Sequence, residues 1–327
     1  MTVLVWSIAV LQVLVPCALI LWVWRRRPAT RLEWVTGVAA GASAFAVLAI
    51  VLPWSVVPWW MRRVYAVAGL VVVSISVVRS RRRPSVNMPG RRQLMAVGTQ
   101  MALTVFFGGA LIAAVTGMTA PGEPAIDLAC PLGTGSYLVV NGGNSLLLNS
   151  HLETLDTAAR YMPWRGQSYG IDVVQLDAWG RRSDGVLPPE PARYRIFGQV
   201  VLAPCSGRVV SVANDRPDMP VPQPDPDRAR LAGNHVLIDC QGAEVLLAHL
   251  QRGSVVVAPG EQVTTAQRLG LVGNSGNTTE PHLHVSAQRR QAGESLIGGA
   301  PVWLTVNGRY LVRNDRLVCG GPGLTRE

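Results

Sequence analysis

Lysine is missing from this chain of 327 residues, and acidic residues are almost missing from its first third. All 30 basic residues are therefore arginine. Residues 1–118 hold twelve of them and a single acid, Glu33, whereas residues 119–327 hold 18 arginines and 19 acids. A nucleic-acid-binding domain needs a basic face on its folded part. Because the second part of the chain is close to neutral, we exclude nucleic acid as a partner.

Charge is also missing from four long apolar stretches in residues 1–118. At a rise of 1.5 Å per residue, three of the four stretches are long enough to cross about 30 Å of hydrocarbon. The remaining one, which is the third along the chain, has about 15 residues and needs neighbouring apolar residues or a tilt to cross. We therefore predict four transmembrane helices with the lipid bilayer as their partner. Because they carry no acid or histidine of the kind that lines an ion path, they are typical of an anchor. The stretches are Val3–Trp24, Val35–Trp60, Val64–Val78 and Leu94–Met118.

Arginine clusters set the expected orientation of these spans. They lie in the first and third loops, and only Arg62 and Arg63 lie in the second. By the positive-inside rule the first and third loops are cytoplasmic, so the N-terminus and everything after Met118 lie outside. A cleaved signal peptide has its positive charge before the apolar run, whereas here the charge follows it. The two clusters are Arg25, Arg26, Arg27 and Arg31, and Arg79, Arg81, Arg82, Arg83, Arg91 and Arg92.

Long apolar runs are absent after Met118. A loop rich in Pro and Gly, Thr119–Pro124, leads into short β-branched runs separated by turns, which indicate an all-β domain with antiparallel strands. We divide this part into a linker and N-terminal portion (119–162), a main β domain (163–290) and a C-terminal extension (291–327), in which Trp303 and Val306–Val312 suggest further strands. The polar insert Asp215–Arg230 is expected to be a surface loop. The expected strands are Tyr137–Val140, Ile171–Val174, Gln199–Leu202, Arg208–Val212, His235–Asp239, Val245–His249 and Ser254–Val257.

Cysteine is scarce, and its distribution is informative. Cys17 lies inside the first span, and the other four lie in the outer region, where an even number is consistent with two disulfides. Four cysteines allow three pairings. Cys205 opens one expected strand and Cys240 closes another, which favours Cys205–Cys240 and leaves Cys130–Cys319 to join the ends of the domain. The absence of a Cys-x-x-Cys spacing argues against a cysteine zinc site.

Only five histidines occur, all in the outer region: His151, His235, His249, His282 and His284. Neutral imidazole is a common zinc ligand and acid–base group. His282 and His284 are two residues apart on an expected strand, so they point to the same face. Two imidazoles on one face can share a zinc site, or they can be polar residues on a solvated strand face.

Several motifs in fixed order resemble the lysostaphin/LytM-type metallopeptidases, over roughly Gln167–Val285. The final one, Gly273-Asn-Ser-Gly-Asn-Thr-Thr-Glu-Pro-His-Leu-His284, resembles the family's closing signature. Upstream segments that resemble family elements are Gly170-Ile-Asp172, Ala203–Val209, Gly233–Asp239, Val245–His249 and Val257–Gly273. The membrane half lies outside the resemblance, which marks residues 163–290 as the peptidase-type domain.

The resemblance implies a Zn²⁺ site and a substrate. Asp172 and His284 would be zinc ligands, and His249 and His282 the catalytic pair that orients the attacking water and stabilises the oxyanion. Peptidoglycan peptides are the implied substrate, and the implied location is the bacterial cytoplasmic membrane, with the C-terminal domain extracytoplasmic. Other cell-wall hydrolases or division proteins stay open as partners.

The sequence departs from the family pattern at one zinc ligand. The histidine expected four residues before Asp172 is Ser168, and its neighbour is Gln167. Neither is a good zinc ligand, and a catalytic zinc normally has three protein ligands. Three explanations stay open: His151 fills the gap, zinc binds weakly, or the site is dead. His235, in the middle of an expected strand, is assigned a structural role.

We therefore predict a membrane-anchored zinc metalloendopeptidase that cleaves peptide bonds of peptidoglycan. The alternative is a degenerate, non-catalytic domain that binds the cell wall or regulates another hydrolase. The two differ in whether the chain holds stoichiometric zinc.

Overall fold

The computed structural model describes residues 2–26, 28, 30–81, 90–122, 126–227, 230–291 and 293–320. It divides into two compact units, Val3–Thr116 and a β-rich unit that begins at Gly117. Each unit is treated by itself. Of the sequence expectations, Arg27, Arg82 and Arg83 of the charged loops, with the linker residues Glu123 and Pro124, lie outside the described residues.

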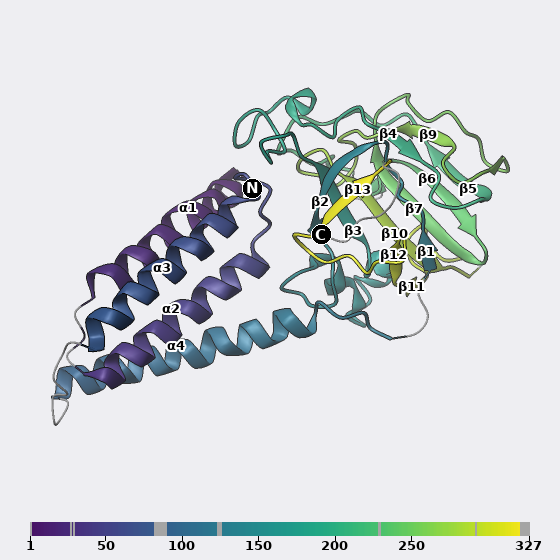
Figure 1. Cartoon of the computed structure of the whole chain (residues 1–327). Coiled ribbons are helices and arrows are strands. Elements are labelled where there is room, and N and C mark those ends of the chain that lie inside the picture. The colour runs from purple at the N-terminus through teal and green to yellow at the C-terminus, as the bar shows by residue number, and fades with distance from the viewer. Residues whose placement is uncertain are drawn as a thin grey trace. The chain divides into compact units, whose positions relative to one another are not determined.

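Within the described residues, the first unit consists of four helices that are long and apolar enough to cross a membrane. They are α1 (Thr2–Arg25), α2 (Arg31–Val51), α3 (Met61–Arg81) and α4 (Arg91–Thr116), labelled in Figure 1. The third is longer than the apolar run indicates, because arginine is a good helix former and both ends of α3 carry it. The expectation that the second run continues to Trp60 was wrong. Helix α2 ends at Val51 since Pro53 disfavours helical geometry in the preceding residue.

Small residues and polar pairs hold the helices of this unit together. Gly41 on α2 lies against Trp22 and Val23 of α1, where a larger residue would keep the backbones apart. The Trp34 indole donates a hydrogen bond to Ser76 of α3 (2.6 Å). Thr36 donates to Gln100 of α4 (2.6 Å). Side-chain bonds of this kind satisfy polar groups that lipid leaves without water.

The second unit is built on one large, mainly antiparallel sheet. Its strand order over the described residues is β13-β2-β3-β10-β7-β6-β5-β8, and β11 pairs with β10. Two small pairs, β1–β12 and β4–β9, lie beside it. The strands are β1 (Ile126–Leu128), β2 (Gly135–Asn141), β3 (Ile171–Gln175), β4 (Val200–Leu202), β5 (Gly207–Ala213), β6 (Asn234–Cys240), β7 (Ala243–Leu250), β8 (Gln262–Val263), β9 (Arg268–Leu271), β10 (Leu283–Arg289), β11 (Ala300–Val302), β12 (Leu304–Val306) and β13 (Arg316–Cys319). The four helices followed by this sheet confirm the predicted fold class.

One expected strand, Ser254–Val257, is absent from the described strands. A side chain binds much of its backbone: the Val255 N–H donates to Asn214 Oδ1 (3.1 Å), and Asn214 Nδ2 donates to the Val255 carbonyl (3.2 Å). Within the described residues, only the Val256 N–H bonds a strand, at the Leu269 carbonyl of β9 (3.0 Å). An asparagine amide offers the same donor and acceptor as a peptide group, so it replaces a ladder partner. The segment therefore runs extended beside Asn214 without entering the sheet.

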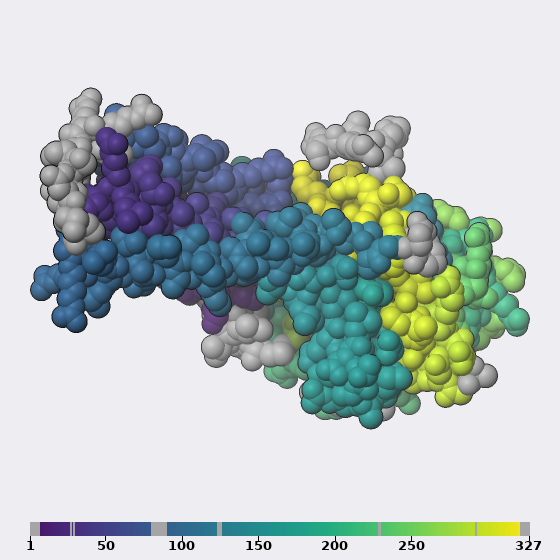
Figure 2. All heavy atoms as spheres, turned by 90° about the horizontal axis from the view of Figure 1, so that it is seen from below, coloured from purple at the N-terminus to yellow at the C-terminus, as the bar shows by residue number. Residues whose placement is uncertain are grey.

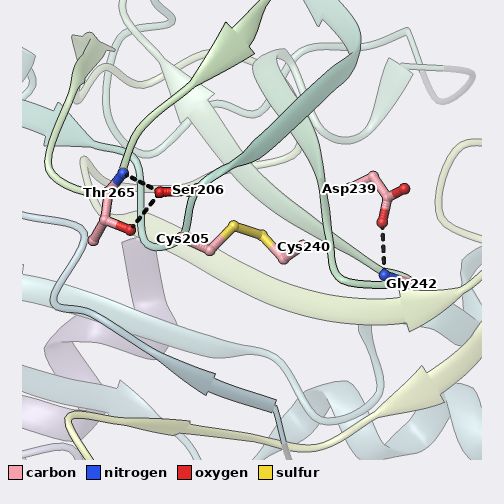
Figure 3. The surroundings of a disulfide bond; sticks show 6 residues. All are labelled: Cys205, Ser206, Asp239, Cys240, Gly242 and Thr265. Atoms are coloured by element: carbon pink, nitrogen blue, oxygen red, sulfur yellow. Dashed lines mark hydrogen bonds between the residues drawn. A yellow bond between two sulfur atoms is a disulfide. The ribbon is translucent and has the colours of Figure 1, made fainter.

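Both disulfides have the pairing that the sequence favours. Cys205 precedes β5 and Cys240 ends β6, and the antiparallel register of these strands brings their Cα atoms to 6.0 Å. Figure 3 shows this bond between the Ser206–Thr265 hydrogen bonds and the Asp239–Gly242 turn. Cys130 and Cys319 join the two ends of the β-rich unit across 189 residues of sequence.

Residues after 290 contribute two strands to the large sheet. Strand β11 pairs with β10 and β13 pairs with β2, whereas β12 pairs with β1 in a separate two-stranded sheet. In Figure 2, the yellow C-terminal residues lie beside the teal residues that precede β3, consistent with the contact between β11 and the 3-10 helix Met162–Gln167 (η2). The expected strand Val306–Val312 overlaps β12 only at its first residue. Strand β12 ends at Val306, because Asn307 and Gly308 turn the chain with positive φ.

Candidate metal centre

The antiparallel pairing of β3 with β10 brings two candidate ligands together. Asp172 lies directly opposite His284 in the register. Their neighbours Ile171, Val173 and Leu283 are buried in the core. Because successive side chains on a strand alternate between faces, Asp172 and His284 project from the opposite face of the sheet. The local sequence thus sets the face, and the register sets the contact.

Three histidines surround the Asp172 carboxylate. His284 Nδ1 lies 2.8 Å from Oδ1, and His151 Nε2 lies 3.0 Å from Oδ2. His282 Nε2 lies 3.6 Å from Oδ1. One ligand atom from each of His151, Asp172 and His284 lies within 4.8 Å of the others. The structure therefore brings His151 into the place where a third ligand is needed.

This donor set fits zinc. Two imidazoles and a carboxylate leave one open position of a four-coordinate site, the ligand count of catalytic zinc. Ligand atoms about 2.0–2.2 Å from a tetrahedral zinc lie about 3.3–3.6 Å apart, which is inside the 4.8 Å that spans one ligand atom from each of the three residues. In addition, His284 Nε2 is buried without a hydrogen-bond partner among the described residues, whereas Nδ1 of the same ring contacts Asp172, so Nε2 is a nitrogen that a metal could engage.

The electrostatics of the cluster favour the protonation states that metals need. Burial alone would raise the pKa of Asp172, but the charges of His151 and His282 and the hydrogen bonds from His151 and His284 hold it well below its usual range. Burial lowers the pKa of His284, against the opposing effect of Asp172. An ionised carboxylate beside neutral imidazole is the ligand state that binds a cation.

His151 reaches the site from a short 3-10 helix, Ser150–Leu155 (η1). Asn149 caps this helix: its Oδ1 accepts from the His151 N–H (3.1 Å), and its Nδ2 donates to the Gly170 carbonyl two residues before Asp172 (3.1 Å). Thr154 donates to the His151 carbonyl (2.7 Å). The helix carrying His151 is thereby tied to the strand carrying Asp172.

Ser168, which stands where the family pattern has a zinc ligand, serves this same segment. It is fully buried, and its hydroxyl lies 2.8 Å from Thr154 Oγ1 and 2.6 Å from the Arg165 carbonyl oxygen, either of which can accept its single proton. Its hydroxyl is therefore engaged away from the carboxylate of Asp172. Through Thr154, Ser168 supports the helix that presents His151.

The expected catalytic pair lies beside this cluster. The rings of His249 and His282 are 4.7 Å apart, and that of His249 is 6.0 Å from His284. His249 Nδ1 faces the Ser275 carbonyl (2.8 Å), and His282 Nδ1 faces the Glu280 carbonyl (2.8 Å). A carbonyl only accepts, so each Nδ1 carries the proton and each Nε2 keeps a lone pair. Both histidines can therefore accept a proton at Nε2.

His249 adopts a backbone conformation that residues other than glycine rarely adopt, with φ of +64° near the end of β7. Hydrogen bonds of its N–H to Ala232 and of its carbonyl to the Gly273 N–H hold it there (both 3.0 Å). Strain of this kind persists only where the surroundings enforce it, and it clusters at functional sites. Burial also lowers the pKa of His249 well below the ordinary value, as do the charges of His282 and His284.

The remaining sequence candidate, His235, stays outside the cluster. It is buried on β6, with Nδ1 3.0 Å from the Gly233 carbonyl. Sequence reasoning missed two residues that the structure joins to Asp172. Asn141 donates to Asp172 Oδ2 (2.8 Å), and Arg313 donates to Asn141 (2.7 Å). An asparagine before two glycines indicates only a turn, so no signal in the sequence pointed to these residues.

Gly170 leaves the space that the His284 ring occupies. A Cβ at this position would lie 2.7 Å from His284 Cε1 and 2.9 Å from the Gln167 carbonyl oxygen. We expect Gly170→Ala to displace His284 and to raise the zinc dissociation constant at least tenfold, because overpacking typically costs about 1–3 kcal/mol. Titration against a chromophoric chelator measures the zinc dissociation constant. Gly133→Ala is the control, since a Cβ there meets nothing within 4 Å. Equal zinc affinity in both variants would contradict the expectation.

Comparison with known proteins relates part of the β-rich unit to one family. The model of Peptidase family M23 matches residues 194–296. The comparison with curated proteins found no match. Among solved structures, the catalytic domain of lysostaphin from Staphylococcus simulans is 19% identical, with 38% of this chain and 69% of that chain covered and a TM-score of 0.25.

Two further solved structures are similar to parts of the chain. A zinc-containing peptidase from Vibrio cholerae is 20% identical, covering 46% of this chain and 40% of that one (TM-score 0.22). Csd3 from Helicobacter pylori is 16% identical, covering 60% and 38% (TM-score 0.29). This chain thus spans less than half the length of either. Such low scores carry no residue correspondence. The finding that carries weight is that residues 194–296 of the β-rich unit match the model of Peptidase family M23, which supports the resemblance to the lysostaphin/LytM-type peptidases.

Proposed function

We propose that this protein is a membrane-anchored zinc metalloendopeptidase that cleaves peptide bonds of peptidoglycan outside the bacterial cytoplasmic membrane. One observation carries the proposal: ligand atoms of His151, Asp172 and His284 converge within 4.8 Å, directly beside the His249–His282 pair. A complete ligand set next to two proton acceptors is the minimum that metal-assisted peptide hydrolysis requires.

The five residues have two roles: three would be metal ligands, and two would transfer protons. His151, Asp172 and His284 would hold zinc, which when bound supplies Lewis acidity toward a water molecule and the scissile carbonyl. His249 and His282 each keep a lone pair at Nε2 because their Nδ1 protons are engaged by backbone carbonyls. One accepts the proton of the attacking water at Nε2, and a protonated Nε2 donates to the developing oxyanion or to the leaving amine.

Three features support the location and the substrate class. The four apolar helices are suited to crossing a bilayer. The arginines near the ends of α1, α3 and α4 favour a cytoplasmic position for the first and third loops. The two disulfides of the β-rich unit are typical of an oxidising compartment. A peptidase-family domain in that position meets the peptide crosslinks of the cell wall.

The test uses the full chain purified in detergent. We expect about one zinc per chain and hydrolysis of crosslinked peptidoglycan peptides. His249→Ala and His282→Ala should each keep the zinc and lower the hydrolysis rate roughly 100- to 10,000-fold, the usual contribution of an acid–base group. His235→Ala, a buried histidine outside the cluster, is the matched control. No zinc in the wild-type chain, even after metal is added back, would leave a non-catalytic module that binds the cell wall or regulates another hydrolase.

A further inference from the structure

Arg313 is a cation from the C-terminal residues, outside the family match, that reaches the neighbourhood of the metal centre. It lies between β12 and β13, and the pairing of β13 with β2 brings it beside the end of β2. Its guanidinium donates to the Val140 carbonyl (2.9 Å), the Leu147 carbonyl (3.0 Å) and Asn141 Oδ1 (2.7 Å). These partners belong to β2 and to the turn that leads to η1. Arg313 therefore fastens both segments that border the site.

Asn141 connects this guanidinium to the site. A bulge in the β2–β3 pair sets it opposite Asp172, and its Nδ2 donates to Asp172 Oδ2 (2.8 Å). Its Oδ1 accepts from Arg313 and lies 3.4 Å from the backbone N–H of Ser150, the residue before His151. One amide thus contacts the strand of one candidate ligand and the helix of another.

The direction of this amide is set by Arg313. Arginine has only donors, so it must face the amide oxygen, and the NH₂ group then has to face the carboxylate. An ionised carboxylate can only accept hydrogen bonds, so this orientation of the amide gives every donor and acceptor in the chain of contacts a suitable partner. Without Arg313, only the long contact with the Ser150 N–H (3.4 Å) and the Asp172 carboxylate itself would hold the amide in this direction.

We propose that Asn141 and Arg313 are positioning residues of the metal centre: Arg313 locks the amide of Asn141, and Asn141 holds the Asp172 carboxylate and the His151 segment in their ligating arrangement. This inference rests on the proposed function. The intervening amide matters, because an arginine paired directly with Asp172 would compete with a cation for the carboxylate. A neutral N–H instead orients the carboxylate and leaves its charge for the metal.

The experiment measures metal binding to the full chain in detergent by chelator competition, and the absorption spectrum of the cobalt-substituted protein. We expect Asn141→Ala and Arg313→Ala each to weaken zinc binding about 10- to 100-fold, the usual effect of losing a partner behind a ligand. The cobalt spectrum should change in both. The double variant should bind zinc within about threefold of the weaker single variant, because both residues act through one chain of contacts.

Arg316→Ala is the control. Arg316 begins β13, three residues after Arg313, and donates to Ser136 on β2 (2.9 Å), five residues before Asn141. Its removal should change zinc affinity less than twofold. If Arg313→Ala fails to fold, the zinc affinity of Asn141→Ala alone tests the inference. That variant keeps the hydrogen bonds of the Arg313 guanidinium to the Val140 and Leu147 carbonyls. Wild-type affinity and an unchanged cobalt spectrum in Asn141→Ala would overturn the inference, as would fully additive losses in the double variant. Failure of the wild-type chain to bind zinc would instead overturn the proposed function.

Discussion

Replacing His151 with alanine is expected to lower the zinc affinity of the full chain roughly 100- to 1000-fold. Structural zinc sites with four ligands bind with about 10–16 kcal/mol, or about 3–4 kcal/mol for each ligand. His151 supplies one of three ligands here, with Nε2 only 3.0 Å from Asp172 Oδ2. Its loss leaves two protein ligands, fewer than a catalytic zinc site normally has. Chelator competition on the detergent-solubilised chain measures the change.

His284→Ala should cause a loss of the same size, because it removes an equivalent ligand from the other side of the carboxylate. His235→Ala controls for the removal of a buried imidazole from the same sheet and should bind zinc as the wild type does. If His284→Ala lost zinc while His151→Ala kept it, His151 would be excluded as the replacement for the ligand missing at Ser168. The site would then have only two protein ligands.

The second large effect is expected from the Cys130–Cys319 disulfide. A crosslink stabilises chiefly by restricting the unfolded chain, and the restriction grows with the closed loop. The 189-residue separation corresponds to about 5 kcal/mol, against about 4 kcal/mol for the 35-residue separation of Cys205–Cys240. Because whole domains are stable by only about 5–15 kcal/mol, the Cys130→Ala/Cys319→Ala variant should lose much of its stability. Denaturant unfolding followed by near-ultraviolet circular dichroism measures this.

This disulfide should also affect the metal centre. Cys319 ends β13, and Arg313 precedes that strand, so a loosened C-terminus weakens the hold of Arg313 on Asn141. We expect zinc affinity to fall in Cys130→Ala/Cys319→Ala and to stay unchanged in Cys205→Ala/Cys240→Ala, whose bond joins β5 to β6 at a distance from Asp172 in the sheet order. If Cys205→Ala/Cys240→Ala lost more zinc affinity than Cys130→Ala/Cys319→Ala, the result would contradict the expected order of the two effects and the explanation through Arg313.

Much of the fold follows from local pattern. The apolar runs that form α1–α4 are long and uncharged, and the short β-branched runs between turn residues coincide with β2, β3, β5, β6 and β7. The short strands β1, β8 and β11 were not predicted, because segments of two or three residues carry no periodic signal. Ser254–Val257 had the composition of a strand, but Asn214 occupies its backbone groups.

The sequence by itself determined the four apolar helices, the antiparallel sheet and the disulfide pairing that it favoured, and its resemblance to a family pointed to four residues of the candidate site. Asp172, His249, His282 and His284 sit in motifs whose spacing sets the face or end of a strand. Only the tertiary structure decided that His151 joins them and that Asn141 and Arg313 lie behind Asp172. Arg313 is 172 residues from Asn141, and His151 is 21 residues from Asp172. Contacts over such separations depend on strand register and loop closure, which no local pattern of residues encodes.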